Sequence, residues 1–296
     1  MRVVVTGSSG MVGSALTDRL SDPETEIFRL VRNESKHETD IPWNPETGIL
    51  DRLQLENMDA VVHLAGENIA GRRWTRSQKD RILNSRVQST QLLCQSLSSL
   101  NNPPSVLISA SAIGFYGHRG ETVCGESTSA GTGFLADVCQ AWESATQPAR
   151  QAGIRVIHLR IGIVLSTVSG ALAKMLMPFK CGVGGKVGAG EQYWSWVSLN
   201  DLIEMILHCI HSDTLIGEVN AVSPQPITNL EFTKTLGRVI HRPTIFPLPS
   251  FIARLALGEM ADELLLSSTR VIPEKLKQDG DRFLHPTLEG ALLDLL

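Results

Sequence analysis

The sequence predicts an α/β protein with a doubly wound parallel sheet, and three observations support this prediction. A β-branched run at residues 3–5 leads directly into three glycines spaced three apart, Gly7, Gly10 and Gly13. An amphipathic helix pattern follows, with its apolar positions at Met11, Val12, Ala15, Leu16 and Leu20. Short apolar strands then alternate with helical patterns as far as residue 160, which is typical of sheets covered by helices on both faces.

The first strand, the glycine-rich turn and the first helix together form an arrangement that binds phosphate. Gly7 permits a tight turn, Gly10 lets the backbone approach a pyrophosphate, and Gly13 lets the helix pack closely on the strand. The helix N-terminus adds free N–H groups and the positive end of the helix dipole. We expect dinucleotide contacts from Thr6, Gly7, Ser9, Gly10, Met11, Val12 and Gly13. The alternative is a tight strand–helix turn without a ligand.

The remaining helices and strands are predicted from the spacing of apolar residues and from Gly and Pro residues that end regular structure. Further strands are expected at residues 26–31, 59–65, 105–109 and 154–160. Helices are expected at residues 75–100, 134–151, 199–211 and 229–240, with a mostly helical region at 250–296.

This pattern divides the chain into a dinucleotide-binding domain and a smaller substrate region. We assign residues 1–165 to the first, with a later contribution near 198–222, and residues 166–197 and 223–296 to the second. Three prolines within 242–249 indicate a boundary there. The second region is expected to be mainly helical.

Composition narrows the class of protein. The formal net charge of the 296 residues is -4 and aromatic residues make up 5%, which argues against a nucleic-acid-binding protein. No apolar run of about 18 residues is present, so no membrane span is expected. The five cysteines show no CxxC spacing and no signal-peptide pattern precedes the first strand, which favours a reduced, cytoplasmic protein.

The end of the second predicted strand bears on the choice of nucleotide. An acidic residue there usually accepts bonds from the ribose 2′-hydroxyl, whereas an arginine accommodates a 2′-phosphate. Val31 takes the expected acidic place, Arg32 follows it, and Glu34 lies two residues further on. Because a guanidinium matches a phosphate in a planar, bidentate fashion, the sequence favours NADP(H) over NAD. The alternative is that Arg32 is a solvated loop charge.

Two further segments are candidates for cofactor contact. Leu64, Ala65 and Gly66 close the strand at 59–65, and small residues there leave room for the adenine and its ribose. Arg86 lies midway along the predicted helix at 75–100 and could turn toward the cofactor phosphates or form a surface ion pair. The sequence does not decide between these two roles.

Several motifs resemble the short-chain dehydrogenase/reductase superfamily, in its extended, epimerase-like branch. They are the glycine turn at 6–13, the strand at 59–65 and the segment at 109–117. More narrowly, the segments at 64–71 and 182–192, with the pairs 73–74, 85–86 and 142–143, resemble its atypical "epimerase family" subgroup. This resemblance implies NADP(H) binding, a Rossmann fold, a small C-terminal domain over the last 50 or so residues, and a cofactor that also passes Ser109 and its neighbours.

The superfamily's usual catalytic pair is missing from this chain. That pair is Tyr-x-x-x-Lys, in which the lysine lowers the pKa of the tyrosine so that it can act as acid or base. Neither Tyr116 nor Tyr193 is followed by a lysine four residues later. Alignment of the helix at 134–151 places Leu135 and Cys139 where the pair would stand. Ordinary dehydrogenase or epimerase catalysis is therefore in doubt.

Other groups remain as candidates for proton transfer. Ser111 follows the strand at 105–109 and resembles the superfamily's substrate-orienting serine, and Tyr116 carries a phenol nearby. Water is the third candidate. Cys139 could be a nucleophile, but a cysteine on the inward face of a helix is more often inert core.

Three further patterns have mainly structural interpretations. Glu204, His208 and His211 share one helix face, but without further ligands we expect a solvated face and no metal. His63, within an apolar strand, is read as a hydrogen-bonded structural histidine. Trp194 and Trp196 should point the same way along one strand, into a substrate cleft, the core or a dimer contact.

The sequence therefore favours an NADP(H)-binding oxidoreductase-like protein that transfers a hydride. Its substrate would be an unidentified small carbonyl compound or sugar nucleotide, entering between the dinucleotide domain and the 170–200 and C-terminal segments. The alternatives are a non-catalytic NADP(H)-sensing scaffold and a sugar-nucleotide epimerase. The superfamily resemblance also allows a homodimer.

Overall fold

An eight-stranded sheet lies at the centre of the protein, whose computed structural model describes all residues except 33, 34 and 36. The strand order is β12-β8-β6-β5-β1-β2-β3-β4. The strands are β1 (Arg2–Thr6), β2 (Glu26–Val31), β3 (Asp40–Asn44), β4 (Ile49–Leu50), β5 (Ala60–His63), β6 (Val106–Ala112), β8 (Arg155–Ile161) and β12 (Gly217–Ala221). All neighbouring strands are parallel except β3 and β4. The predicted doubly wound parallel sheet is confirmed.

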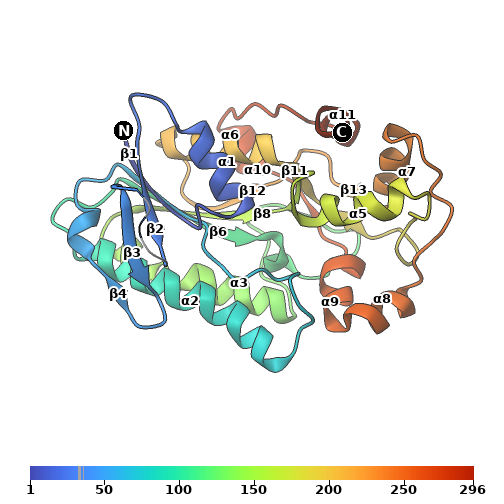
Figure 1. Cartoon of the computed structure of the whole chain (residues 1–296), viewed down its shortest axis with the longest axis horizontal. Coiled ribbons are helices and arrows are strands. Elements are labelled where there is room, and N and C mark those ends of the chain that lie inside the picture. The colour runs from blue at the N-terminus through green and yellow to red at the C-terminus, as the bar shows by residue number, and fades with distance from the viewer. Residues whose placement is uncertain (33–34, 36) are drawn as a thin grey trace.

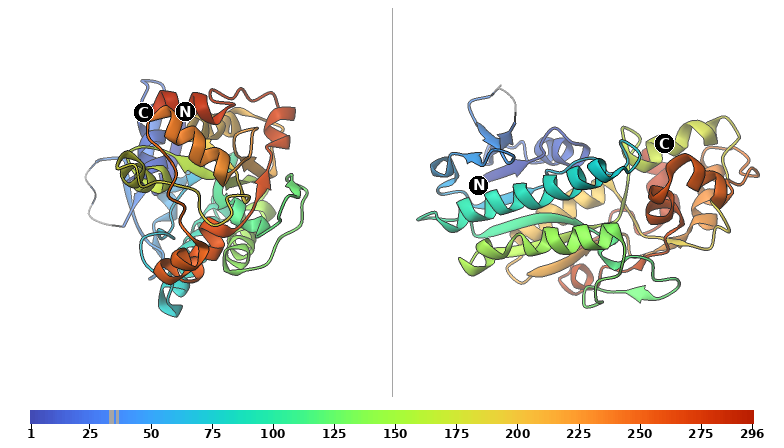
Figure 2. Two further views of the ribbon diagram at one scale, coloured as in Figure 1. Left: turned by 90° about the vertical axis from the view of Figure 1, so that its right-hand side faces the viewer. Right: turned by 90° about the horizontal axis from the view of Figure 1, so that it is seen from below.

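Helices cover both faces of this sheet (Figures 1 and 2). On one face lie α1 (Met11–Arg19) and α6 (Leu199–His211), and on the other α2 (Arg76–Ser98), α3 (Phe134–Ser144) and α4 (Gln147–Gln151). Strand β1 contributes apolar side chains to both faces of the sheet, because successive side chains of a strand point to opposite faces. Val3 and Val5 pack toward α1 and α6, whereas Val4 packs toward α2.

The remaining elements are short, and most of them build a second lobe beside the carboxyl ends of the strands (Figure 1). Its helices include α5 (Gly170–Lys180), α7 (Asn229–Val239), α8 (Ser250–Leu257), α9 (Glu259–Ala261), a π-helical turn (Asp262–Leu266) and α11 (Leu288–Leu295). Helix α10 (Glu274–Gln278) packs on β12. Three two-stranded pairs complete the fold, β10 (Tyr193–Trp194) with β13 (Ile227–Thr228), β11 (Trp196–Ser198) with β9 (Ile163–Leu165), and β14 (Arg270–Val271) with β7 (Val123–Cys124). The short helices η1 (Arg52–Leu55) and η2 (Ile113–Tyr116) lie in connections.

Three local predictions need correction. The helix expected at 134–151 is broken into α3 and α4, because Pro148 cannot donate within a continuous helix and its ring crowds the preceding turn. The strand expected at 105–109 extends to Ala112, so Ser111 lies within β6 and not after it. A single strand was expected to carry Trp194 and Trp196, yet β10 and β11 are separate strands.

Both tryptophans belong to the core of the second lobe. They are 5% and 1% exposed and pack with Leu172, Phe232 and Leu292. Their indole N–H groups donate to the carbonyl oxygens of Leu265 and Gln225. The core interpretation therefore holds, and neither ring lines an open cleft.

The two lobes share an apolar cluster. Trp74 just before α2, Ile82 of α2, Leu135 and Val138 of α3, and Met260 of α9 bury their side chains together. Across the described residues, no helix combines the length and apolarity that crossing a bilayer requires.

Candidate nucleotide-binding site and an adjoining polar cluster

The glycine turn at the start of the chain has the geometry that a bound phosphate requires. Gly7 has a φ of 68°, and a Cβ on it would lie 2.9 Å from the carbonyl carbon of Leu64. A Cβ on Gly13 would lie 2.2 Å from the Gly7 oxygen, so only glycine lets α1 approach the turn this closely. Gly10 caps α1 without a side-chain bond, and both it and Ser9 are exposed. The amides of the first helical turn are therefore accessible to an anion.

Thr6 fixes the end of β1 against the end of β5. Its hydroxyl oxygen accepts bonds from the backbone N–H groups of Leu64 and Ala65, both at 3.1 Å, so its proton is directed to His63 Nδ1 at 2.7 Å. His63 Nε2 consequently carries the ring proton and donates it to Thr90 at 3.0 Å. Burial lowers the pKa of His63 to about 4. The interpretation of His63 as a structural histidine is confirmed.

The carboxyl end of β2 presents an arginine to solvent. Val31 is half-buried and Arg32 is exposed. Among the described residues, Arg32 has no hydrogen-bond or ion-pair partner. Glu34, which would serve an NAD ribose, lies outside the described residues.

Arg86 supports the loop that follows β5. Its Nη1 donates to the carbonyl oxygens of Glu67 and Ile82, both at 3.1 Å, and its guanidinium lies 4.9 Å from the ring centroid of Trp142. A Cβ on Gly66 would lie 3.2 Å from the guanidinium carbon. The surface ion pair considered from the sequence is not formed with any described residue. Burial lowers the pKa of this guanidinium.

The two serines of β6 are both buried. Within the part of the chain that the structure describes, the Ser109 hydroxyl makes only a long contact of 3.5 Å, to the carbonyl oxygen of Ala110. Ser111 donates its hydroxyl proton to Glu143 Oε1 at 2.7 Å. Its hydroxyl is therefore already committed to a carboxylate of α3.

The hydroxyl group of Tyr116 is also hydrogen-bonded to other groups of the protein. Tyr116 is 0% exposed, donates to Asn220 Oδ1 at 2.7 Å and accepts from Arg160 Nη1 at 3.1 Å. Burial raises its pKa to about 12. This packing gives its hydroxyl a structural role and no access to a substrate.

The positions of the absent catalytic pair lie in the core. Leu135 is 9% exposed and packs against Gly114 of η2. Cys139 is 3% exposed, its sulfur lies 3.7 Å from the carbonyl oxygen of Ala112, and burial raises its pKa to about 11. The thiol at this position is an inert core group.

Strand register gathers a row of polar side chains on the sheet face beneath α3. Ser109, His158 and Glu218 are paired across β6, β8 and β12, and one step along, Ser111, Arg160 and Asn220 are paired. Arg160 then forms a bidentate ion pair with Glu143, with both N···O distances at 2.8 Å. This cluster was not predicted from the sequence. The alternation of polar and apolar residues at 157–160 was the available signal.

The residues considered for a metal on α6 do not converge. Glu204 forms an ion pair with Arg19 at 2.8 Å, and His208 Nε2 lies 2.7 Å from Asp279. His211 Nδ1 contacts the carbonyl oxygen of Leu207 on its own helix.

Sequence comparison establishes the family. Residues 3–221 match the NAD dependent epimerase/dehydratase family, and residues 248–295 match a domain of unknown function, DUF1731. The chain belongs to the epimerase/dehydratase family. Among curated family members, epimerase family protein Mb2239 of Mycobacterium bovis is 43% identical, over 98% of this chain and 96% of its own. Epimerase family protein YfhF of Bacillus subtilis is 35% identical, over 100% and 98%.

Solved structures of epimerase-family proteins agree with this assignment. Human epimerase family protein SDR39U1 (isoform 2), determined with NADPH, superposes with a TM-score of 0.92 at 30% identity, covering 100% of this chain and 99% of the human one. A nucleoside-diphosphate sugar epimerase of Corynebacterium glutamicum gives 0.83 at 34% identity, covering 100% of this chain and 58% of that protein. The chain thus has the dinucleotide-binding fold of the NAD(P)-dependent epimerase family, with a helical C-terminal part.

Proposed function

We propose that this epimerase-family protein binds NADP(H) and transfers a hydride to or from a small carbonyl compound or sugar nucleotide. The observation that carries the proposal is Arg32, exposed and without a described partner at the end of β2, beside Val31 where a carboxylate would select NAD. A planar guanidinium in that place matches a 2′-phosphate. The human relative that was determined with NADPH supports the same choice.

The residues of the glycine turn fit the cofactor. The clearance between Gly13 and Gly7 and the uncapped N-terminus of α1 leave backbone amides for a pyrophosphate. Leu64, Ala65 and Gly66 would border the adenosine. When bound, the nicotinamide supplies or receives the hydride.

The proton that accompanies the hydride needs a source other than the superfamily's tyrosine. Ser111 and Tyr116 both donate to acceptors of the protein, Glu143 and Asn220. We therefore propose that water delivers the proton. A water-dependent proton step predicts a slow turnover with a shallow pH profile.

Calorimetric titration of the wild-type chain and an Arg32→Ala variant with NADPH and NADH tests the cofactor assignment. We expect the wild type to prefer NADPH by about tenfold, equivalent to about 1.4 kcal/mol, and Arg32→Ala to lose that preference. Arg52→Ala is the matched control, because Arg52 is an exposed arginine on η1, which precedes the amino end of β5. Equal binding of the two cofactors by the wild type would contradict the proposal.

A second candidate is a non-catalytic protein whose NADP(H) state controls a partner. The buried Leu135 and Cys139 at the catalytic positions favour it. It predicts that proteins co-purifying with the chain change when NADPH is added, in the absence of turnover. An unchanged set of partners would exclude it.

A further inference from the structure

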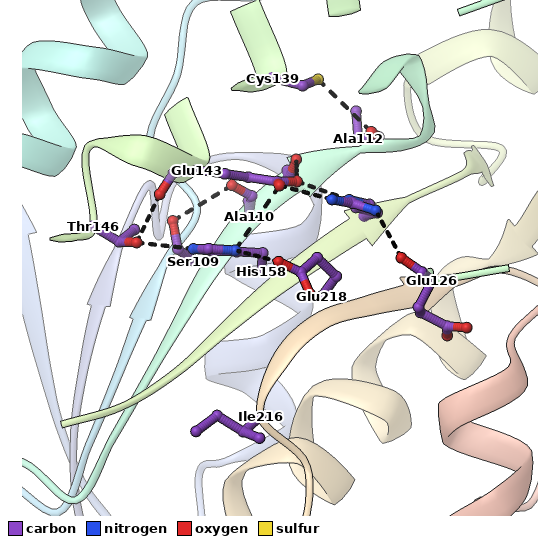
Figure 3. A network of polar contacts seen from close by, with 12 residues as sticks. Ser109, Ala110, Ala112, Glu126, Cys139, Glu143, Thr146, His158, Ile216 and Glu218 are labelled. Atoms are coloured by element: carbon purple, nitrogen blue, oxygen red, sulfur yellow. Dashed lines mark hydrogen bonds and ion pairs between the residues drawn. The ribbon is translucent and has the colours of Figure 1, made fainter. Parts of the chain in front are cut away.

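Three side chains from different elements converge beside the ion pair of Arg160. Glu143 of α3, His158 of β8 and Glu218 of β12 offer ligand atoms that all lie within 4.8 Å of one another. His158 Nδ1 lies 3.9 Å from Glu143 Oε2 and 3.9 Å from Glu218 Oε1 (Figure 3). The register of β8 and β12 fixes this arrangement, because Glu218 is paired directly with His158.

The hydrogen bonds around His158 define which ring nitrogen faces the carboxylates. The Thr146 hydroxyl donates to the carbonyl oxygen of Glu143 at 2.7 Å, so at its 2.8 Å contact with His158 Nε2 it must accept. Nε2 therefore carries a proton, and Nδ1 is the atom left for another interaction. His158 is 2% exposed, and among the described residues no group lies within hydrogen-bond distance of its Nδ1.

A bare Nδ1 in this position requires a positive neighbour. In a neutral ring its lone pair would point between two carboxylates, which is electrostatically unfavourable in a buried place. The guanidinium of Arg160 offsets only one of the two negative charges. One unit of negative charge remains for a cation that Nδ1 can bind.

Glu143 and Glu218 each have the capacity to bind such a cation. Oε1 of Glu143 accepts from Ser111 and from Arg160 Nε, and Oε2 accepts from Arg160 Nη2, which leaves a free lone pair on Oε2. Glu218 Oε1 lies 3.9 Å from His158 Nδ1 and supplies the second carboxylate oxygen. The Glu218 side chain is 36% exposed and gives the site access to solvent.

We propose that Glu143, His158 and Glu218 form a binding site for a divalent transition metal of the zinc class. A proton shared with either carboxylate would draw the N···O distance to about 2.7–3.2 Å. Two ligands on one tetrahedral ion with bonds of about 2.0–2.2 Å lie about 3.3–3.6 Å apart, so the two separations of 3.9 Å need to close by only a few tenths of an ångström around such an ion. One imidazole with two carboxylates is a donor set that such metals accept.

The surroundings resemble the outer shell of known metal sites. A ligating histidine usually donates its other N–H to a fixed acceptor, as His158 does to Thr146. Arg160 and Ser111 hold the Glu143 carboxylate in the same manner. The proposal does not depend on Arg32 or on the glycine turn, which carry the cofactor assignment.

Zinc titration of the full chain after chelator treatment tests the site. We expect one equivalent of Zn²⁺ to bind, with Co²⁺ giving the visible absorption of a low-coordinate site. Glu218→Gln keeps the side-chain shape and should weaken binding by at least about tenfold, as loss of an anionic ligand requires. His208→Gln is the matched control, since His208 also lies beside two carboxylates, those of Asp279 and Asp281, and it should bind as the wild type does.

Nitrogen NMR of the histidine rings distinguishes the metal from a proton. We expect zinc to shift His158 Nδ1 to the range of a coordinated nitrogen while Nε2 stays protonated. Three results would each overturn the proposal: no stoichiometric zinc binding at micromolar concentrations, equal affinity in wild type and Glu218→Gln, or a His158 ring protonated on both nitrogens and unchanged by zinc. Because Glu218 is half-exposed, its variant remains informative even if a His158 variant does not fold.

Discussion

At the scale of single residues, several short chains of hydrogen bonds connect the buried polar groups of this protein. Thr6, His63 and Thr90 form one of them and join the ends of β1 and β5 to α2. The sequence indicated that His63 is structural, because it stands alone in an apolar strand. It could not indicate the partners, which lie 57 and 27 residues away.

His63 predicts a loss of stability in mild acid. Its native pKa of about 4 lies below the unfolded value near 6.5, so the unfolded chain takes up the proton first as the pH falls. The unfolding free energy should therefore decline between about pH 6.5 and 4, by as much as about 3 kcal/mol from this residue. Urea unfolding of the wild type and His63→Gln at several pH values measures it. The variant should have the shallower slope, and the exposed control His37→Gln should match the wild type.

At the scale of elements, the turn between β1 and α1 is the part most completely determined by local sequence. Gly7 must adopt a positive φ, and Gly13 must lack a Cβ, so the motif encodes its own geometry. The single helix expected at 134–151 was predicted wrongly, because the apolar periodicity of the sequence continues past the break that Pro148 imposes between α3 and α4. Strands β3 and β4 were not predicted either, since Pro42 interrupts the pattern of a strand that lies near the sheet edge.

A comparison of Gly13→Ala with Gly48→Ala should distinguish the effect of a steric clash on stability and nucleotide binding from the effect of backbone strain. The new methyl of Gly13→Ala would lie 2.2 Å from the Gly7 oxygen, so we expect loss of nucleotide binding and a fall of about 1–3 kcal/mol in the unfolding free energy. Gly48→Ala is the control, because Gly48 has a φ of 70° but nothing within 4 Å of an added Cβ. It should cost about 1–2 kcal/mol and leave nucleotide binding intact. Denaturant titration and calorimetry report both quantities, and NADPH binding by Gly13→Ala would refute the packing argument.

The polar cluster beneath α3 depends on how strands β6, β8 and β12 are aligned with one another, so it could not be predicted from short stretches of sequence. His158 and Glu218 are neighbours only because β8 and β12 pair in parallel at that position. A shift of one residue would turn Glu218 to the opposite face of the sheet. Sequence spacing alone carries no information on that choice.

At the scale of the whole molecule, the apolar cluster between the lobes makes the C-terminal part integral to the fold. Met260→Ala would open a cavity against Trp74, Ile82 and Leu135, so we expect destabilisation of about 2–5 kcal/mol in a single transition. Leu255→Ala, at a side chain 76% exposed on α8, should change stability by less than about 0.5 kcal/mol. Thermal unfolding monitored by two probes would show whether the lobes melt together. Two separate transitions would mean that the lobes are independent.

The two borders of the central sheet bear on self-association. At one border β4 contributes only Ile49 and Leu50, and at the other α10 packs along β12, with Lys275 donating to the carbonyl oxygen of Ile216. Long unpaired strand borders are what recruit further chains into mixed sheets and aggregates. Fibril growth by strand addition would therefore find only the two residues of β4 at one border and a strand packed against α10 at the other.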